Sequence, residues 1–243
     1  MATGRQSDGG SLELMPSVRC HLDGLEVPLT EGMRSLVITV ALEGDGLSRR
    51  SLQVRMWPDL ESYSAAKRLR QLLWRVKRET GDRLLNAASG CVRLAESVSV
   101  DLHWAERRAR GIVNGEVPAS IDTDEWSFLG EELLSGWPDE SVWEAQDRWN
   151  RLRLHALERL AERALDVGDI PAAIEFASAA VSVDEFNEVP HRVMAAAYLA
   201  RGDIASSWRV FTKFQQLLRR EMGLEPSSSF RDLVGRRRAA RSA

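Results

Sequence analysis

The chain has 243 residues, of which 28% are charged and 44% hydrophobic, proportions typical of a globular protein. Its formal net charge of −3 excludes a protein that is basic throughout. The basic residues are nevertheless concentrated, because residues 65–83 hold seven Lys or Arg against only Glu79 and Asp82. Such a positive patch on a near-neutral domain is the electrostatic footprint expected of a nucleic-acid-binding surface.

Cysteine usage and the first residues bear on the cellular compartment. Cys20 and Cys91 lie far apart and form no set of paired cysteines. Residues 1–15 lack the apolar core of a secretory signal, and the longest apolar run, residues 36–42, is too short to span a bilayer. We therefore expect a reduced, cytoplasmic protein without membrane association, in which residues 1–10 form a disordered tail.

The first structured elements are predicted to be short strands. Within residues 11–31, the strand-like segments 18–22 and 25–29 flank a turn at Asp23-Gly24, which is typical of a β-hairpin. Residues 33–43 contain the β-branched run from Val37 to Val40, so propensity alone favours a strand there. Residues 48–57 show helical spacing after Ser48, a candidate N-cap, and Pro58 ends that helix.

A basic amphipathic helix is predicted over residues 64–78, after a loop at residues 59–63. At 3.6 residues per turn, one face gathers the apolar residues Leu69, Leu72, Leu73 and Val76. The other face gathers Lys67, Gln71, Trp74, Arg75 and Arg78, flanked by Arg68, Arg70 and Lys77. The helix thus has an apolar side to anchor it and a cationic side suited to the major groove. A solvated arginine-rich face is the alternative interpretation when the helix is taken alone.

A β-hairpin is predicted directly after the basic helix. Residues 83–87 and 92–95 are separated by Ala88-Ser89-Gly90, a turn with glycine at its tip. If residues 33–43 form a helix in spite of that propensity, the order is strands, two helices, a basic helix and a hairpin, which predicts a winged helix-turn-helix over residues 11–97. The wing carries Arg83 and Arg93, which could reach a DNA backbone or minor groove.

The second half of the chain is helical and repetitive. Gly168-Asp169-Ile170 recurs as Gly202-Asp203-Ile204 at an offset of 34 residues, and the flanking residues agree in the same register. This period predicts tetratricopeptide-like units, each a helix, a Gly-Asp turn and a second helix.

An acidic connector at residues 111–147 joins the two halves. It contains no Lys or Arg and ten Asp or Glu, together with aromatic residues such as Trp126, Trp137 and Trp143. We expect these aromatics to pack under the repeat domain. The alternative is an acidic and aromatic surface that touches RNA polymerase or the basic helix.

Several motifs, taken in order, resemble those of the Streptomyces antibiotic regulatory proteins, an actinobacterial family of transcriptional activators. In the first half the motifs are Val27-Pro28-Leu29, Leu47-Ser48 with Trp57-Pro58-Asp59, the basic helix, and Gly90 with Arg93-Leu94. In the second half they are Leu134-Ser135-Gly136-Trp137, Arg153-Leu154-His155-Ala156 and Glu221-Met222-Gly223-Leu224-Glu225-Pro226. The resemblance covers roughly residues 11–234.

The resemblance implies a mainly α protein with an OmpR-like winged helix-turn-helix, which includes a small sheet and a wing. A tetratricopeptide-like bacterial transcriptional activation domain would follow over residues 98–234, and residues 235–243 would form a basic tail. Residues 33–43 should then be the first helix of the winged domain, and residues 64–78 the recognition helix. The loop at residues 59–64 would contact RNA polymerase, with Asp59, Glu61 and Tyr63 as candidates.

We therefore expect a DNA-binding activator that self-associates on direct repeats in promoter DNA and recruits RNA polymerase. The candidate DNA contacts are Lys67, Arg68, Arg70, Gln71, Trp74, Arg75, Lys77, Arg78 and Arg93. No enzyme motif, metal-ligand cluster or cofactor-binding motif is found in the sequence.

A second hypothesis is a protein-interaction adaptor whose winged domain no longer binds DNA specifically. It is favoured by Trp74 in the middle of the exposed face and by the lack of basic residues at residues 30–33. Trp74 would then contact the repeat domain rather than DNA.

Overall fold

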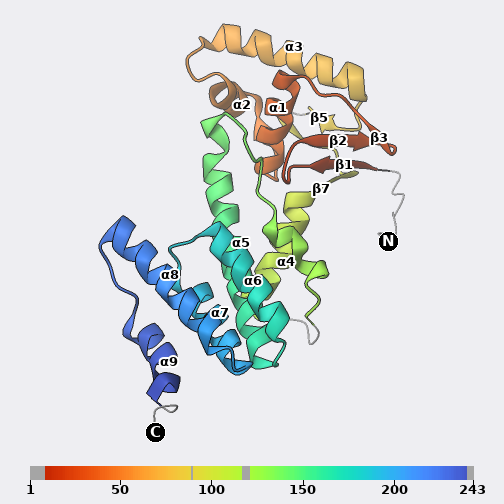
Figure 1. Cartoon of the computed structure of the whole chain (residues 1–243). Helices are drawn as coiled ribbons and strands as arrows, with labels where there is room; N and C mark the ends of the chain where they lie inside the picture. The colour runs from red at the N-terminus through yellow and green to blue at the C-terminus, as the bar shows by residue number, and fades with distance from the viewer. Residues whose placement is uncertain (1–8, 89, 117–120, 240–243) are drawn as a thin grey trace. The chain divides into compact units, whose positions relative to one another are not determined.

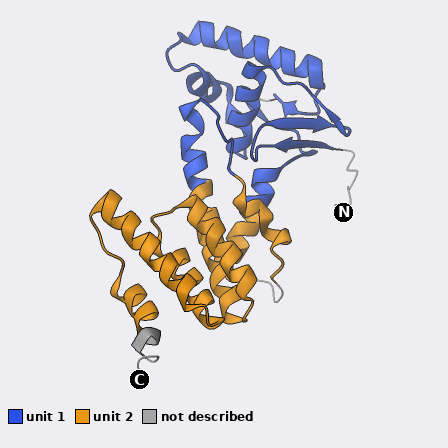
Figure 2. Cartoon of the chain, in the orientation of Figure 1, with its two compact units in different colours: residues 1–105, 132–148 blue, residues 106–131, 149–243 orange. Residues whose placement is uncertain are grey.

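A computed structural model describes residues 9–88, 90–116 and 121–239. The chain is mainly helical and divides into two compact units (Figures 1 and 2). The first unit comprises residues 1–105 and 132–148, and the second comprises residues 106–131 and 149–243. Of the tails expected at the ends, residues 1–8 and 240–243 lie outside the described residues, whereas Gly10, expected in the disordered tail, is the first residue of a strand.

The first unit contains two small sheets. Strand β1 (Gly10–Glu13) pairs antiparallel with β2 (Arg19–Leu22) and parallel with β7 (Val98–Val100), and β2 pairs with β3 (Leu25–Glu26). The expected turn at Asp23-Gly24 is confirmed, with both residues at positive φ. The second sheet has the order β4 (Leu47–Ser48), β6 (Cys91–Leu94), β5 (Leu85–Asn86), and the pair β5–β6 is the predicted hairpin.

Residues 33–43 lie almost entirely in a helix, α1 (Glu31–Leu42), so the propensity for a strand is overruled. Met33, Leu36, Val37, Val40 and Ala41 are all buried. They recur at intervals of three, one, three and one residues, which places them on one helical face. Burial of this face in the core outweighs the weaker β preference of the branched side chains, as the family resemblance implied.

Two further helices complete the helix-turn-helix. Helix α2 (Arg49–Met56) is capped as predicted, because Ser48 Oγ accepts a hydrogen bond from the Ser51 amide at 3.0 Å. Helix α3 (Ser62–Thr80) begins two residues before and ends two residues after the predicted basic helix. The first turn was missed because Ser62 and Tyr63 carry no helical pattern of their own. The last turn ends at buried Thr80, whose Oγ1 donates to the Val76 carbonyl at 2.8 Å, before Gly81 at positive φ.

The loop from α1 to β4 approaches the wing closely at Gly46. A Cβ at this position would lie 2.8 Å from the Arg93 Cβ and 2.9 Å from the Val92 carbonyl oxygen, and φ is +87°. Gly46→Ala is therefore expected to lower the free energy of unfolding by about 2–4 kcal/mol through steric overlap and backbone strain. Urea denaturation measures this loss.

Gly44 of the same loop is the matched control. Its φ is +65°, but a Cβ on Gly44 would meet no described atom within 4 Å, so Gly44→Ala carries strain alone, about 1 kcal/mol. Equal losses from the two variants would contradict the close approach of this loop to the wing.

The second unit contains the predicted repeats. Helix α5 (Trp143–Asp166) starts in the first unit and is followed by α6 (Ile170–Val183), α7 (Glu188–Ala200) and α8 (Ile204–Met222). The two Gly-Asp turns have the same geometry: both glycines have φ of +83°, and Asp169 and Asp203 each accept a hydrogen bond from the amide three residues later. The 34-residue repeat is thus confirmed as two tetratricopeptide-like units.

The connector does not pack as a single element under the repeats. Helix α4 (Asp101–Val113) leads into it, and 3₁₀ helix η1 (Asp124–Gly130) buries Trp126 in the second unit. Residues 132–148, which include 3₁₀ helix η2 (Glu140–Val142), instead belong to the first unit. There the Leu134 amide donates to the Leu14 carbonyl at 2.9 Å, which corrects the expectation for this segment.

Trp143 also departs from that expectation, since 57% of its surface is exposed. Helix α9 (Ser228–Ala239) closes the chain, with Phe230 and Val234 buried against residues of α7 and α8. The first five residues of the expected basic tail therefore continue a helix. The boundary predicted at residue 97 remains a prediction.

Both cysteines are free, and Cys20 is buried. Burial raises the pKa of the Cys20 thiol to about 11, so this side chain is an inert core residue at neutral pH. Among the described residues, no helix is long and apolar enough to cross a membrane.

Candidate nucleic-acid interface

Helix α3 presents the two faces that its sequence predicts. Ala65, Leu69, Leu72 and Val76 are buried, while Leu73 at the edge of this face is only half-buried. The buried side fixes the helix against the rest of the unit, so the opposite side is turned to solvent. The exposed residues on it are Lys67, Arg68, Arg70, Gln71, Trp74, Arg75, Lys77 and Arg78.

The cations of this exposed face divide into two groups. Lys77 pairs with Asp82 at 3.0 Å, and Arg78 pairs with Glu79 at 2.5 Å. Lys67, Arg68, Arg70 and Arg75 form no ion pair with any described residue. Exposed pairs contribute little to stability, so Lys77 and Arg78 can exchange their carboxylates for phosphates at small cost. The other four cations are free to bind an anion directly.

Trp74 lies in the middle of this face with 60% of its surface exposed. The Arg78 guanidinium carbon is 5.0 Å from the centre of the indole ring, a cation–π contact. This contact holds Trp74 and Arg78 side by side on the helix surface. A large exposed apolar ring beside cations can pack on a thymine methyl group or a sugar.

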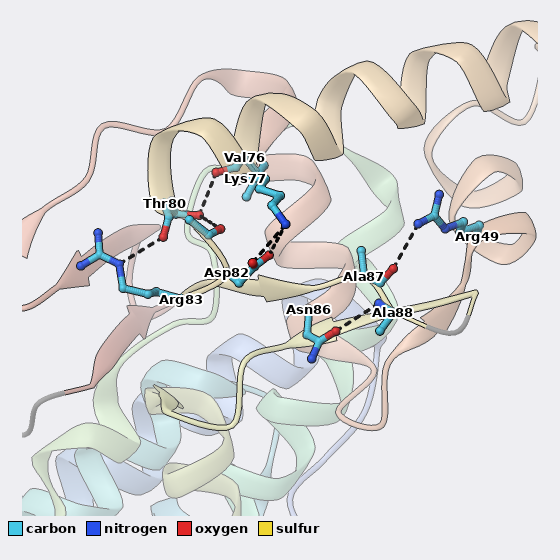
Figure 3. A network of polar contacts seen from close by, with 10 residues as sticks. Arg49, Val76, Lys77, Thr80, Asp82, Arg83, Asn86, Ala87 and Ala88 are labelled. Carbon is cyan, nitrogen blue, oxygen red and sulfur yellow. Dashed lines mark hydrogen bonds and ion pairs between the residues drawn. The ribbon is translucent and has the colours of Figure 1, made fainter.

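A groove of about 620 Å³ runs between α3 and the wing hairpin. Arg70, Trp74 and Lys77 line it from α3, and Asn86 and Ala87 line it from the wing. Figure 3 shows the Lys77–Asp82 pair and the polar contacts that join this end of α3 to its neighbours. The groove therefore has cations on the side of α3 and small or uncharged residues on the side of the hairpin.

The two wing arginines differ in their contacts. Arg93 is exposed on β6 and free to reach a phosphate. Arg83 is engaged within the unit, because its Nε donates to the Thr80 carbonyl at 3.2 Å (Figure 3). Its guanidinium also pairs with Asp23. Arg83 therefore ties the end of α3 to the β2–β3 turn, and DNA contact by Arg83 would require breaking that tie.

Arg49 is a candidate contact that sequence reasoning missed. Its guanidinium donates to the Ala87 carbonyl at 3.1 Å (Figure 3). Its amide donates to the Gly90 carbonyl at 3.1 Å, so both contacts join α2 to the wing. It also lines the groove beside α3. The sequence did contain a signal for this role. Arg49 and Arg50 begin α2, and cations are unfavourable at a helix N-terminus, so their presence there calls for another reason such as ligand contact.

The turn between α2 and α3 carries the polymerase-contact candidates. Asp59 and Glu61 are exposed, and Tyr63 has 82% of its surface exposed. Tyr63 was expected in the loop. Because α3 begins at Ser62, Tyr63 lies instead in the first turn of that helix. The three side chains nonetheless fall within five residues of one another at the N-terminal end of α3.

No group of three or more His, Cys, Asp or Glu in the described part of the chain could hold a metal ion. The features that α3 and the wing bring together are cations, an aromatic ring and an amide, Gln71. These groups bind phosphates and base edges rather than activate a nucleophile.

Comparisons with known proteins found similarity to a domain family and to a solved structure. Residues 124–236 match the family model described as bacterial transcriptional activator domain. Mycobacterium tuberculosis EmbR, solved in complex with a low affinity phosphopeptide, has a similar fold with a TM-score of 0.71 at 16% sequence identity. The similarity covers 93% of this chain, which spans 64% of the length of that protein. No curated protein gives a significant match.

Proposed function

We propose that this chain, whose residues 124–236 match the model of the bacterial transcriptional activator domain, is a transcriptional activator that binds promoter DNA and recruits RNA polymerase. The exposed face of α3 would lie in the major groove and the wing would contact the adjacent backbone. The protein would act in the cytoplasm, by binding and not by catalysis, without a cofactor.

The observation that carries this proposal is the set of four exposed cations on α3 that have no carboxylate partner among the described residues. Each Lys or Arg that meets a phosphate releases counterions from DNA, and this release provides most of the affinity. The candidates for phosphate contact are Lys67, Arg68, Arg75, Lys77, Arg78 and Arg93.

Sequence discrimination would come from Gln71 and Arg75, neighbours on the same face. A Gln amide can pair with adenine through two hydrogen bonds and an Arg guanidinium with guanine, and each pair contributes about 1–3 kcal/mol of discrimination. Arg70 and Trp74 would extend the contact into the groove beside the wing.

A single winged helix covers few base pairs, so one copy would bind weakly at cellular salt concentrations. Binding of two copies to direct repeats would supply the missing affinity through self-association on DNA. Asp59, Glu61 and Tyr63 would remain available to RNA polymerase at the N-terminal end of α3.

A protein-interaction adaptor is the second candidate function. Exposed Trp74 favours it, because Trp is enriched at protein interfaces relative to the rest of the surface. Residues 30–33 also lack a cation that could reach the DNA backbone.

Equilibrium binding to DNA fragments from the protein's own promoter neighbourhood, measured across a salt series, distinguishes the two. Contact with four to six phosphates per protomer predicts a slope of log affinity against log salt of roughly −4 to −5. We expect a discrete fragment to bind with this slope. Weak binding to every fragment would support the adaptor.

A further inference from the structure

A pocket of about 300 Å³ lies between helices α6, α7 and α8 of the second compact unit. Helix α7 contributes His191, Met194 and Tyr198, spaced so that they share one face. Helices α8 and α6 contribute the remaining lining residues, which are Ser206, Arg209, Val210, Lys213 and Val181.

The charged groups of the pocket come from α8. Arg209 and Lys213 are both exposed, are one helical turn apart, and form no ion pair with a described residue. Like charges at this spacing repel one another and destabilise a helix, so an anion between them would be favourable. Arg209 instead donates to Ser206 Oγ at 2.8 Å, and that hydroxyl donates to Asp203 at 2.6 Å.

Asp203 offsets only part of this positive charge, because its carboxylate caps α8 and interacts with the charge of Arg209, whereas no described carboxylate pairs with Lys213. It accepts from the Ser206 amide at 3.0 Å as well as from the Ser206 hydroxyl. These two hydrogen bonds lower the pKa of Asp203, so it stays ionised at neutral pH.

His191 forms part of the pocket wall as a neutral group. Its ring lies 4.4 Å from the Phe214 ring centre, and its Nε2 is 3.0 Å from the Glu185 carbonyl oxygen, a distance that fits N–H donation. Burial lowers the pKa of His191, and the charge of Lys213 lowers it further. Arg209 and Lys213 are therefore the positive charges of the pocket.

The first repeat shows that the fold does not require these polar groups. At the 34-residue offset, His191 corresponds to Leu157, Ser206 to Ala172, Tyr198 to Ala164, Arg209 to Glu175 and Lys213 to Ala179. Leu157, Ala164 and Ala172 are buried apolar residues of the ordinary repeat core. The second repeat thus replaces buried apolar residues with His191, Tyr198 and Ser206 at three positions that line the pocket.

We infer that this pocket binds a small carboxylic acid with an apolar body, whose carboxylate lies between Arg209 and Lys213. Val181, Met194, Tyr198 and Val210 offer the apolar walls for the body of the ligand. The volume is at the lower end of the range for small-molecule sites, which suits a chain of about ten non-hydrogen atoms. The inference does not depend on DNA binding.

Octanoate is a suitable probe, with 1-octanol as the neutral analogue and acetate as the charge without the apolar body. Each is titrated into the full chain and followed by the backbone amide NMR signals of residues on α7 and α8. We expect saturable shifts at Tyr198, Ser206 and Arg209 with octanoate, and at least about tenfold weaker binding of the other two probes.

Matched variants locate the carboxylate. Arg209→Ala/Lys213→Ala should weaken octanoate binding by about tenfold or more, whereas Arg201→Ala/Arg220→Ala, which removes two exposed cations outside the pocket, should change it less than about twofold. Val210→Phe introduces the residue found at the equivalent position 176 and should abolish binding by filling the pocket, with both cations kept.

Three results would overturn the inference. They are the absence of saturable shifts at these amides, equal binding of 1-octanol, and unchanged binding by Arg209→Ala/Lys213→Ala.

Discussion

Replacing Lys67, Arg75 and Arg78 together with alanine is expected to weaken binding to the promoter fragment by at least about 100-fold at moderate salt. All three side chains are exposed on α3, and Arg78 needs only to leave its exposed pair with Glu79 to reach a phosphate. Each lost phosphate contact should also flatten the slope of log affinity against log salt by about 0.9. Fluorescence anisotropy at several salt concentrations measures the affinity and the slope together.

The control is a second triple variant with the same change in net charge. Arg159→Ala/Arg201→Ala/Arg220→Ala removes three exposed cations from the second unit. It should keep the affinity within a few fold and leave the slope unchanged. Equal losses in the two variants would mean that affinity depends on overall charge and not on the face of α3.

The largest loss of stability is expected from Arg153→Met in the second unit. Arg153 is only 5% exposed, and its guanidinium donates to the Gly130 carbonyl at 3.0 Å and to Asn150 Oδ1 at 2.9 Å. Longer contacts reach the Leu129 and Glu131 carbonyls. Methionine fills much of the space but removes the donor to the Gly130 carbonyl and to Asn150 Oδ1, while the Glu131 carbonyl keeps its bond from Trp149 Nε1, and the loss should cost about 3 kcal/mol or more. Urea denaturation followed by circular dichroism measures the shift in midpoint.

Arg159→Met on the same helix is the control for that loss. Arg159 is exposed, and its contact with Glu162 is 4.0 Å long, so the change should stay within about 0.5 kcal/mol. A similar small effect from Arg153→Met would show that Arg153 does not hold η1 against α5.

The parts of the fold that sequence predicts well are those set by local chemistry. Ser48 begins α2 because its hydroxyl caps the helix, and the two Gly-Asp turns repeat because glycine supplies positive φ and aspartate caps the next helix. The apolar spacing on α3 likewise fixes which side is exposed. These signals lie within a few residues of the structure they specify, so the sequence shows them directly.

The failures arise where distant contacts decide the structure. The run from Val37 to Val40 favours a strand locally, yet core packing makes α1 a helix. Residues 132–148 lie near the repeats in sequence but join the first unit, where Leu134 meets Leu14. Neither outcome can be derived from local pattern, although the resemblance to the Streptomyces antibiotic regulatory proteins implied the first.

The candidate site shows the same division. Exposure of the basic face follows from helical periodicity, whereas the partners of individual arginines do not. Arg83 is held by Asp23, sixty residues away, and Arg49 reaches the wing at Ala87. A sequence shows which residues are charged, but their partners depend on the turns and strands that the fold brings together.

The acidic and aromatic surface suggested for residues 111–147 stays a prediction. Acidic residues of η1 and η2 are exposed, and so is the ring of Trp143. Among them, Glu125 pairs with Arg108 within the second unit. The rest of this segment would meet a basic partner surface if it acts in recruitment.

Run-off transcription from the bound promoter fragment, with purified RNA polymerase from the same organism, tests the proposed activator most directly. Three proteins are compared: the natural chain, the Lys67→Ala/Arg75→Ala/Arg78→Ala variant, and an Asp59→Ala/Glu61→Ala/Tyr63→Ala variant. We predict that the natural chain raises transcript yield, that the first variant neither binds nor activates, and that the second binds DNA normally but activates less. No activation by the natural chain while it occupies the fragment would contradict the proposed function.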